Sequence, residues 1–362
     1  MIISAFEHQM LIHLIRATVQ TRGTQYPNPA VGAMVIREGQ IISEAYHCSH
    51  GSHHAEVLAL AQAKGRTDGA TLLITLEPCT HHGKTPPCVD AIINHGIKRV
   101  VWAMDDPNPK TSQKAQAILN QHGIEVAANG LSEEAIQCCP EFHAFYAKKR
   151  PYVYVKAAIS LDGMIAPNRT GLTYISSNES LNVVQHLRTW VQAIVVGAHT
   201  IAIDQPRLSI RLDRKGDIQP MIVILDPNNK VDVDWVKRAL ALGRTIYLFR
   251  SAPVAWTHDQ LLVDTSLTKN KKHNWAHVFT MLHQQGIQGV LVEGGGRIFS
   301  SILSAGYFDE LWVTKVPKVL GQAGVPFYPS DHAMDLTVEP RDIQAYGDDV
   351  VMAYKNRHDF SL

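Results

Sequence analysis

The chain contains few cysteines and no long apolar run, and these two absences exclude whole classes of protein. Its 362 residues include five cysteines, Cys48, Cys79, Cys88, Cys138 and Cys139. An odd number with two adjacent members makes a poor disulfide framework, so we expect a protein of the reducing cytoplasm. No apolar stretch reaches the roughly 20 residues that a transmembrane helix needs, so we expect no membrane partner.

Net charge is also small. The 34 lysines and arginines are balanced by 33 aspartates and glutamates, which leaves a formal net charge of +1. A chain with neither a basic field nor a polyanionic tail is not expected to bind nucleic acid. The length of the chain favours two domains over one, and its hydrophobic content of 45% is ordinary for a globular protein.

The first residues lack the pattern of a secretion signal. Residues 7–9 interrupt the apolar positions, and no positively charged segment precedes them. Phe6, Met10, Leu14 and Ala17 instead recur at helical spacing, which predicts an amphipathic helix.

The most informative motif combines His54 and Glu56 with Cys79 and Cys88. A His-x-Glu followed by Pro-Cys and a second cysteine is the signature of zinc deaminases that act on nucleobase-like rings. One imidazole and two thiolates give zinc three protein ligands and leave the fourth tetrahedral position to water, as a catalytic site requires. Zinc lowers the pKa of that water toward neutrality. Glu56 is then predicted to be the general acid/base.

The spacing of the cysteines differs from the general form of the motif. Eight residues separate Cys79 from Cys88, where the general form has two. One alternative is a closed structural site with His81 or His82 as the fourth ligand, but a closed site has no use for Glu56 beside the metal. Another alternative, a set of free buried cysteines, leaves the histidines and the glutamate unexplained.

Periodicity predicts alternating strands and helices in the first part of the chain. A hairpin is expected where Glu38-Gly39 joins residues 33–36 to residues 40–42. The elements predicted after it are helix 54–63, strand 70–76, helix 87–94, strand 98–104, helix 114–121, strand 124–128 and a helix that starts near residue 132. This alternation implies an α/β domain whose central sheet is covered on both faces. The basic run Lys148–Pro151 is interpreted as its boundary, which gives domains at residues 1–147 and 151–362.

The second domain is also predicted to be α/β. Its expected elements are strand 152–159, helix 177–190, strands 193–197, 221–225, 245–249 and 289–292, helix 298–305 and strand 310–316, with helices in between. A glycine turn, Glu293–Arg297, joins strand 289–292 to helix 298–305. Glycines let the backbone approach a ligand closely, and a helix N-terminus favours a phosphate. A tight structural turn explains the same residues equally well.

These residues together resemble a known family, the bifunctional riboflavin-biosynthesis deaminase/reductases. The deaminase half is matched by Pro27–Gly32, His54–Val57, Thr75–Cys88 and Asp106–Pro109. The reductase half is matched by shorter segments: Lys156, Ser160–Gly163, Leu187-Arg188, Val196-Gly197, Thr200, Asp204, Pro206, Leu208, Arg211, Glu293–Gly295, Asp309-Glu310 and Pro317-Lys318. The likeness implies an N-terminal cytidine-deaminase-like α/β/α domain and a C-terminal dihydrofolate-reductase-like α/β domain.

The resemblance implies two consecutive reactions and two cofactors. With Zn²⁺, the first domain would hydrolytically deaminate 2,5-diamino-6-ribosylamino-4(3H)-pyrimidinone 5′-phosphate. With NADPH, the second would reduce the ribosyl chain of the product to ribityl. The implied partners are small phosphorylated pyrimidines, and the implied state is a homo-oligomer.

The resemblance also implies three sets of binding residues. The deaminase substrate would contact Asn28, His47, His81 and Lys84. NADPH would contact Ala158, Tyr174, Thr200, Asp204, Gly295, Gly296, Arg297 and Ile298. The reductase substrate would contact Arg188, Leu208, Arg211 and Glu293. The lysine and the two arginines suit a phosphate, although each arginine also fits a surface ion pair and both histidines also fit structural hydrogen bonds.

Several residues depart from the family pattern. Leu172 stands where a substrate-contacting serine is usual, Leu181 replaces an arginine, Gln205 replaces an acidic residue, and residues 110–114 lack the usual glycines. A lost hydrogen bond at Leu172 would cost roughly 1–3 kcal/mol. These departures leave open a deaminase whose second domain serves only as an assembly module. Two further alternatives are a nucleic-acid deaminase and a protein with purely structural zinc. The small net charge argues against the nucleic-acid deaminase.

Overall fold

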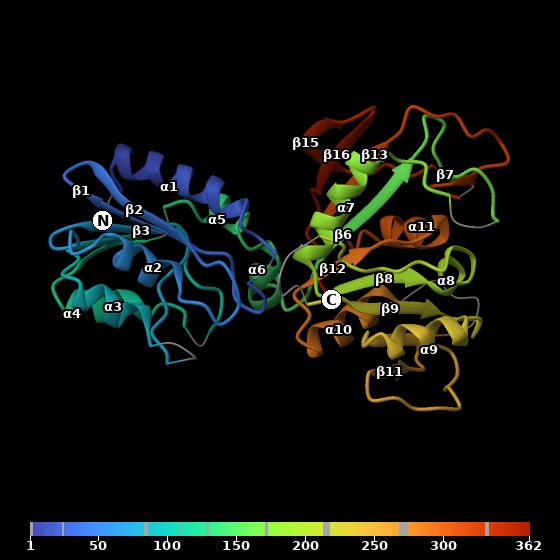
Figure 1. The fold of residues 1–362 in the computed structure, drawn as a ribbon, viewed down its shortest axis with the longest axis horizontal. Helices are drawn as coiled ribbons and strands as arrows, with labels where there is room; N and C mark the ends of the chain where they lie inside the picture. Colours follow the sequence, from blue (N-terminus) through green and yellow to red (C-terminus); the bar gives the residue numbers. More distant parts are fainter. Residues whose placement is uncertain are drawn as a thin grey trace. The chain divides into compact units, whose positions relative to one another are not determined.

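The computed structural model describes residues 3–23, 25–82, 86–109, 111–128, 130–170, 173–212, 218–267, 274–329 and 333–362. The chain divides into two compact units, Met1–Lys149 and Arg150–Leu362 (Figure 1). The division falls within the basic run Lys148–Pro151. Among the described residues, no helix combines the length and the apolar character needed to span a membrane.

The first unit is a five-stranded mixed sheet with helices on both faces (Figure 1). Its elements are α1 (Ala5–Val19), β1 (Gly32–Arg37), β2 (Gln40–Tyr46), α2 (Ala55–Gln62), β3 (Thr71–Ile74), α3 (Cys88–Asn94), β4 (Arg99–Trp102), α4 (Ala115–Gln121), β5 (Glu125–Ala127), α5 (Ser132–Ile136) and α6 (Pro140–Ala147). The strand order is β2-β1-β3-β4-β5. Strand β1 is antiparallel to both neighbours, whereas β3, β4 and β5 are parallel.

Alternate residues along each strand of this sheet enter two different cores. In β3, Leu72 and Ile74 pack among the buried residues of α2, α3 and α4. Leu73, between them, packs on the opposite face with Leu11 and Leu14 of α1. Successive side chains of a strand point to opposite faces of the sheet. The prediction of a sheet covered on both faces is therefore confirmed.

Helix α1 forms where helical spacing predicts it, but its buried face is shifted from the residues that gave the spacing, of which only Leu14 is buried. Phe6 is 41% exposed, whereas Leu11, Leu14, Ile15 and Thr18 are buried. These four residues follow the i, i+3, i+4, i+7 spacing of one helix face. The neighbouring stripe that begins at Phe6 is rotated from this face and remains partly in solvent.

The helix predicted from residue 132 is also corrected, because the chain forms two helices there. Helix α5 ends at Ile136, and α6 begins at Pro140. Proline has no backbone N–H to continue a helix but is well suited to its first turn. Pro140 therefore marks the break between the two helices.

The second unit contains a nine-stranded sheet and a separate two-stranded one. Its elements are β6 (Tyr152–Ile159), β7 (Met164–Ala166), α7 (Asn178–Trp190), β8 (Ala193–Gly197), α8 (Ala198–Asp204), β9 (Met221–Asp226), α9 (Val233–Ala241), β10 (Ile246–Arg250), β11 (Leu261–Asp264), α10 (Trp275–Gln284), β12 (Gly289–Val292), α11 (Gly296–Ala305), β13 (Glu310–Lys315), β14 (Val325–Pro326), β15 (Val338–Tyr346) and β16 (Asp349–Asn356). The order in the large sheet is β11-β10-β9-β8-β12-β6-β13-β16-β15. The first seven of these are parallel, and β16 and β15 follow as an antiparallel hairpin.

The parallel strands of this unit end at one edge of the sheet. Strand β8 ends at Gly197 and is followed directly by α8, whereas β12 ends at Val292 and is followed three residues later by α11. The chain reverses its direction of winding here, because β12 inserts between β8 and β6. Open α/β sheets bind ligands at the carboxyl ends of strands next to such a switch point. This edge is therefore where a second site is expected.

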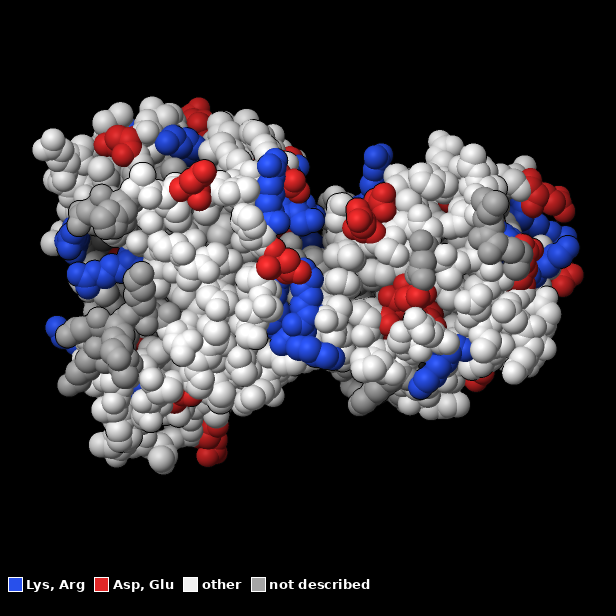
Figure 2. Space-filling model, turned by 180° about the vertical axis from the view of Figure 1, so that it is seen from behind, with Lys and Arg blue, Asp and Glu red and all other residues white. Residues whose placement is uncertain are grey.

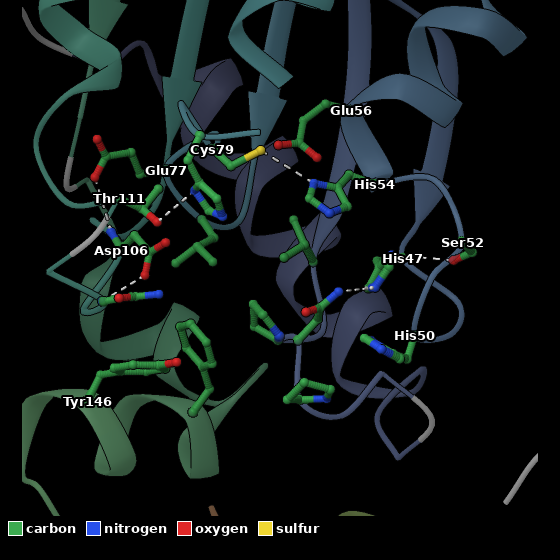
Figure 3. A pocket seen from close by; sticks show the side chains of 18 of the residues that line it. His47, His50, Ser52, His54, Glu56, Glu77, Cys79, Asp106, Thr111 and Tyr146 are labelled. Carbon is green, nitrogen blue, oxygen red and sulfur yellow. Dashed lines mark hydrogen bonds between the residues drawn. The ribbon is translucent and has the colours of Figure 1, made fainter. Parts of the chain in front are cut away.

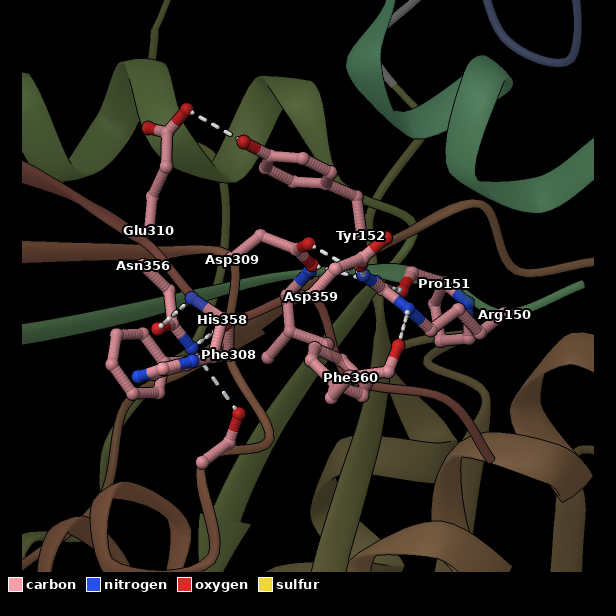
Figure 4. Close-up of polar contacts among 12 residues, drawn as sticks. Arg150, Pro151, Tyr152, Phe308, Asp309, Glu310, Asn356, His358, Asp359 and Phe360 are labelled. Atoms are coloured by element: carbon pink, nitrogen blue, oxygen red, sulfur yellow. Dashed lines mark hydrogen bonds and ion pairs between the residues drawn. The ribbon is translucent and has the colours of Figure 1, made fainter. Parts of the chain in front are cut away.

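The start of the second unit is clasped by the end of the chain (Figure 4). The side chain of Arg150 is fully buried, and its Nη1 and Nη2 each lie 2.8 Å from a carboxylate oxygen of Asp309. Arg150 also donates from Nη2 to Asp359 at 2.8 Å and from Nε to the carbonyl of Phe360 at 2.9 Å. Its guanidinium lies 3.7 Å from the centroid of the Phe360 ring. We call these four residues the C-terminal clasp.

Candidate active sites

The three side chains predicted to bind zinc converge in the first unit. The Nδ1 of His54 lies 3.1 Å from the Sγ of Cys88 and 3.5 Å from the Sγ of Cys79. A tetrahedral zinc with bonds of about 2.0–2.3 Å holds its ligand atoms about 3.5 Å apart, so the donor set fits the metal. Within the described ranges, no other group of His, Cys, Asp and Glu side chains gathers in this way.

Each ligand is held at the end of a regular element. His54 directly precedes α2, Cys88 is the first residue of α3, and Cys79 follows β3. The backbone N–H of Cys88 donates to the Sγ of Cys79 at 3.3 Å. The hydrogen bond from the Cys88 thiol, together with the nearby His54, lowers the pKa of Cys79 to about 4. A lowered pKa favours the thiolate, which is the form of cysteine that binds zinc.

Glu56 lies in the first turn of α2, beside the ligands but not among them. It is 4% exposed. Burial raises the pKa of the Glu56 carboxyl group, and the nearby Cys79 thiolate raises it further. Figure 3 shows the carboxyl group facing the cavity next to His54 and Cys79. A carboxyl group with a raised pKa at an open metal site is suited to proton transfer.

Two of the ligands, His54 and Cys79, and Glu56 line a cavity of about 260 Å³. Figure 3 shows His47 and His50 on one side of it, and Asp106, Thr111 and Tyr146 on the other. A cavity of this size is close to the lower end of the range for small-molecule pockets. One small ring with a substituent is the kind of ligand that such a cavity can hold.

Three of the predicted substrate residues line this cavity, namely Asn28, His47 and His81. The Nδ1 of His47 lies 3.1 Å from the carbonyl oxygen of His53, and its Nε2 lies 3.3 Å from the Nδ2 of Asn28. Burial lowers the pKa of His47, so the ring is neutral, with Nδ1 donating and Nε2 accepting. His81 is exposed at the rim, with its Nδ1 3.4 Å from the Oγ1 of Thr111.

The fourth predicted residue, Lys84, lies outside the described residues. The structure instead adds cavity residues to which the sequence assigned no role, among them Asp106, Asn108 and Tyr146. Burial raises the pKa of Asp106 to about 6, and the backbone N–H of Asn108 donates to its Oδ1 at 2.8 Å. The position of Asp106 in the sequence could have predicted its place in the cavity. Asp106 follows β4, and β4 is parallel to β3, the strand that precedes Cys79. Carboxyl ends of parallel strands meet at one edge.

A second polar cluster lies at the carboxyl edge of the large sheet. The Nε and Nη2 of Arg188 each lie 2.7 Å from a carboxylate oxygen of Glu293, and Nη1 donates to the carbonyl of Ser209 at 2.8 Å. Although burial opposes the shift, the charge of Arg188 lowers the pKa of Glu293. Burial lowers the pKa of the adjacent Lys156 to about 8. The sequence assigned no role to Lys156.

Comparison with known proteins identifies both units. A model described as "Cytidine and deoxycytidylate deaminase zinc-binding region" matches residues 6–104, and one described as "RibD C-terminal domain" matches residues 151–352. The riboflavin biosynthesis protein RibD of Aquifex aeolicus is 36% identical over 341 residues, which cover 92% of this chain and 94% of that protein. The chain belongs to the RibD family. It therefore joins a zinc-binding deaminase domain to a RibD reductase domain and is a bifunctional enzyme of riboflavin biosynthesis.

Further RibD proteins agree with this assignment. RibD of Escherichia coli K12 is 35% identical over 312 residues, which cover 83% of this chain and 84% of that protein. The structure of Acinetobacter baumannii RibD superposes with a TM-score of 0.83 at 28% identity and covers 97% of this chain and 99% of its own. A diaminohydroxyphosphoribosylaminopyrimidine deaminase/5-amino-6-(5-phosphoribosylamino)uracil reductase from Thermotoga maritima gives 0.80 at 32% identity and covers 96% and 99%. The predicted two-domain α/β fold is confirmed, and the cofactors of the RibD family are zinc and NADPH.

The residues predicted to contact NADPH lie mostly at the expected edge of the RibD reductase sheet. Thr200 and Asp204 belong to α8, and Gly295–Ile298 form the N-cap and first turn of α11. A Cβ atom added to Gly295 would lie 3.6 Å from the Oγ1 of Thr200, so the starts of the two helices adjoin. The first N–H groups of a helix such as α11 favour an anion, so a contact with a cofactor phosphate stays a prediction. Ala158 lies in β6, and Tyr174 is 56% exposed.

The remaining predicted contacts of the RibD reductase substrate differ in exposure. Leu208 is 3% exposed, and its carbonyl accepts from the Nη2 of Arg244 at 2.8 Å. Arg211 has an exposed side chain, and its backbone N–H donates to the Oε1 of Gln185 at 2.8 Å. Leu172 lies outside the described residues, so the effect of its missing hydroxyl stays a prediction.

The structure explains one departure from the family pattern. The side-chain amide of Gln205 donates to the Oδ2 of Asp232 at 2.7 Å and accepts from the Nη2 of Arg238 at 2.6 Å. A carboxylate at this position could accept from Arg238 but could not donate to Asp232. In this chain, Gln205 therefore matches both of its neighbours.

Proposed function

We propose that the two units catalyse consecutive steps on one phosphorylated pyrimidine. The first removes the ring amine of 2,5-diamino-6-ribosylamino-4(3H)-pyrimidinone 5′-phosphate, and the second reduces the ribosyl chain of the product to ribityl with NADPH. The observation that carries this proposal is the cluster of three zinc ligands, two of which line one cavity with Glu56. The names of the RibD relatives agree with it.

The proton transfers of the deamination are assigned to Glu56. Zinc held by His54, Cys79 and Cys88 supplies a Lewis acid that makes a water molecule nucleophilic near neutral pH. Glu56 takes a proton as the ring carbon is attacked and delivers protons to a ring nitrogen and to the departing ammonia. Its burial keeps bulk water from competing for these protons, and the raised pKa of Glu56 brings its proton affinity closer to that of the groups it serves.

Recognition of the ring is assigned to the neutral pair Asn28 and His47. The Nδ1 of His47 is held by the His53 carbonyl, so its Nε2 faces Asn28 and the cavity in one defined tautomer. His81 at the rim and Lys84 in the loop between the cysteines are proposed to meet the ribosyl phosphate. A lysine ammonium pairs with a phosphate as a point charge.

In the reductase unit, Glu293 and Lys156 are proposed to contact the ribosyl chain. NADPH supplies the hydride. Lys156, whose pKa is about 8, is close enough to neutrality to supply the accompanying proton. Arg188 holds Glu293 with two of its nitrogens, so we assign it to orienting that carboxylate. The exposed guanidinium of Arg211 is the better candidate for the substrate phosphate.

The remaining expectations about partners concern assembly and location. The face seen in Figure 2 is mostly uncharged and carries side chains of both signs. With a formal net charge of only +1, this supports small-molecule substrates rather than nucleic acid. A homo-oligomer is proposed from the resemblance alone. A cytoplasmic location is supported by the cysteines, whose odd number and adjacent pair make a poor disulfide framework.

A coupled assay with the zinc-loaded protein tests the proposal. Ammonia release and NADPH oxidation are followed separately after adding the diamino-pyrimidinone ribosylamino phosphate. Both signals are expected, with NADPH oxidation lagging behind ammonia. Ammonia without NADPH oxidation would mean that the reductase unit has lost its activity, which would direct attention to Leu172 and Leu181. Neither signal from zinc-loaded protein would reject the substrate.

A further inference from the structure

A buried glutamate in the wall of the deaminase cavity, which is neither a zinc ligand nor a predicted substrate contact, accepts four backbone hydrogen bonds. Glu77 is 3% exposed. Its Oε1 accepts from the N–H groups of Lys114 and Ala115 at 3.1 and 3.2 Å. Its Oε2 accepts from the N–H groups of Gln113 and Asp106 at 3.0 and 3.3 Å. All four donors belong to the loop between β4 and α4 or to the first residue of α4.

The geometry of this loop creates a receptor for an anion. Gln113 has a left-handed backbone, with φ at 60°, and Lys114 after it is right-handed. Such a pair turns successive N–H groups toward one point, which forms an anion-binding nest. Helix α4 begins at Ala115 and receives no cap from the side chain of Lys114. The Glu77 carboxylate, from the segment that follows β3, therefore supplies both the anion of the nest and the missing helix cap.

The same carboxylate connects two walls of the active site. Glu77 lies two residues before Cys79, and its own N–H donates to the carbonyl of Met104 at 2.9 Å. The loop that it binds contributes Asp106, Asn108 and Thr111 to the cavity wall. One side chain thus ties the turn that presents a metal ligand to the wall that faces the substrate, as the positions of Glu77 and Asp106 in Figure 3 illustrate.

We propose that Glu77 is a positioning residue for the deamination, which fixes the wall formed by Asp106, Asn108 and Thr111 at the right distance from the metal ligands. The role rests on the proposed function of this cavity. It requires a carboxylate, because four N–H donors converge on two oxygens. An amide offers one oxygen and turns its NH₂ group toward two of the donors, which leaves them without acceptors.

The variant Glu77→Gln tests this role with almost no change of volume. We expect its KM for the deaminase substrate to rise by about tenfold or more. The wall that binds the substrate loses hydrogen bonds to the charged Glu77 carboxylate and is no longer held in place. Since Glu77 does not touch the reacting atoms, kcat is expected to change by less than about threefold. Zinc content and NADPH oxidation with deaminated substrate are expected to match the wild type.

Hydrogen exchange gives a readout that needs no substrate. The amides of Gln113, Lys114 and Ala115 are expected to exchange faster in Glu77→Gln than in the wild type, because their acceptors are lost. Glu77→Asp, which keeps the charge on a shorter side chain, is expected to recover part of both losses. The matched control is Glu125→Gln, which removes a carboxylate from β5 of the same unit, outside the cavity wall.

Three results would each overturn the role. A wild-type KM in Glu77→Gln, with the three amides exposed to exchange, would mean that the wall does not need this anchor. Loss of zinc from Glu77→Gln, instead of a raised KM, would mean that Glu77 acts on the Cys79 turn alone. If the wild-type protein releases no ammonia from the substrate, the proposed function fails. Unaltered exchange in Glu77→Gln would then still reject the Glu77 anchor independently.

Discussion

Among single residues, Glu56 allows proton transfer to be tested without removing a zinc ligand. It is buried beside the three ligands but is not one of them. Glu56→Gln is expected to keep its zinc and to release ammonia about 10²–10⁴ times more slowly. NADPH oxidation with added deaminated substrate should stay at the wild-type rate, since its site lies in the other unit. Metal analysis and the two separate assays check this, and unchanged ammonia release would make the zinc structural.

Lys156 is expected to make the free energy of unfolding of the reductase unit depend on pH. Burial lowers the pKa of this ammonium from 10.5 to about 8. Between these pH values the unfolded chain binds more protons than the folded one, so this group makes the free energy of unfolding rise with pH, by at most about 3 kcal/mol. The rise is expected in wild-type urea unfolding followed from pH 8 to 10 and not in Lys156→Met. Equal slopes in the two proteins would contradict the shift.

How far the sequence predicts a site depends on whether chemistry or packing selects its residues. His54, Cys79 and Cys88 are predictable because zinc accepts few ligand types at few spacings, and they converge as expected. Glu77 and Lys156 lie in segments that match the family, but the sequence assigned neither of them a role in a site. A glutamate before a proline and a lysine in a strand both have many common explanations. Only the folded chain brings four N–H groups to Glu77 and the charge of Glu293 to Lys156.

At the scale of elements, the C-terminal clasp makes the last residues part of the reductase unit. Asp309→Ala would leave the fully buried guanidinium of Arg150 without its main partner and is expected to destabilise the unit by about 3–5 kcal/mol. Asp359→Ala is the matched control. The Asp359 side chain is 60% exposed, so its loss should cost under about 1 kcal/mol. Urea unfolding of the full chain measures both, and equal effects would rule out the burial argument.

Helices and strands were predictable from the sequence where their side chains are buried on one face or on all faces. The bounds of β6, β8 and β12 are as predicted, because each is a run of apolar residues that no helix period fits. Strand β15 was missed, because its residues from Glu339 to Ala345 are exposed and include Pro340, which argues against a strand. It forms nonetheless, since the turn at Gly347 returns the chain and pairs β15 with β16. Tertiary pairing decided this element.

At the scale of the whole molecule, two separate cores predict two unfolding transitions. The apolar clusters of the deaminase unit and of the reductase unit share no residue. Because a ligand stabilises only the fold that binds it, removal of zinc by a chelator should lower one transition temperature. NADPH should raise only the other. Calorimetry of the full chain with each addition checks this, and a single transition that responds to both would show that the units unfold together.

The strand order of the reductase sheet has a consequence for synthesis on the ribosome. Strand β6 is the first strand of its unit to be made, yet its two neighbours, β12 and β13, come from the last quarter of the chain. The deaminase unit can fold while the rest is still being translated, but β6 must wait with both edges unpaired until nearly the whole polypeptide has emerged. Unpaired apolar edges invite aggregation. A nascent chain arrested before β12 is thus the species of this protein that most needs a chaperone.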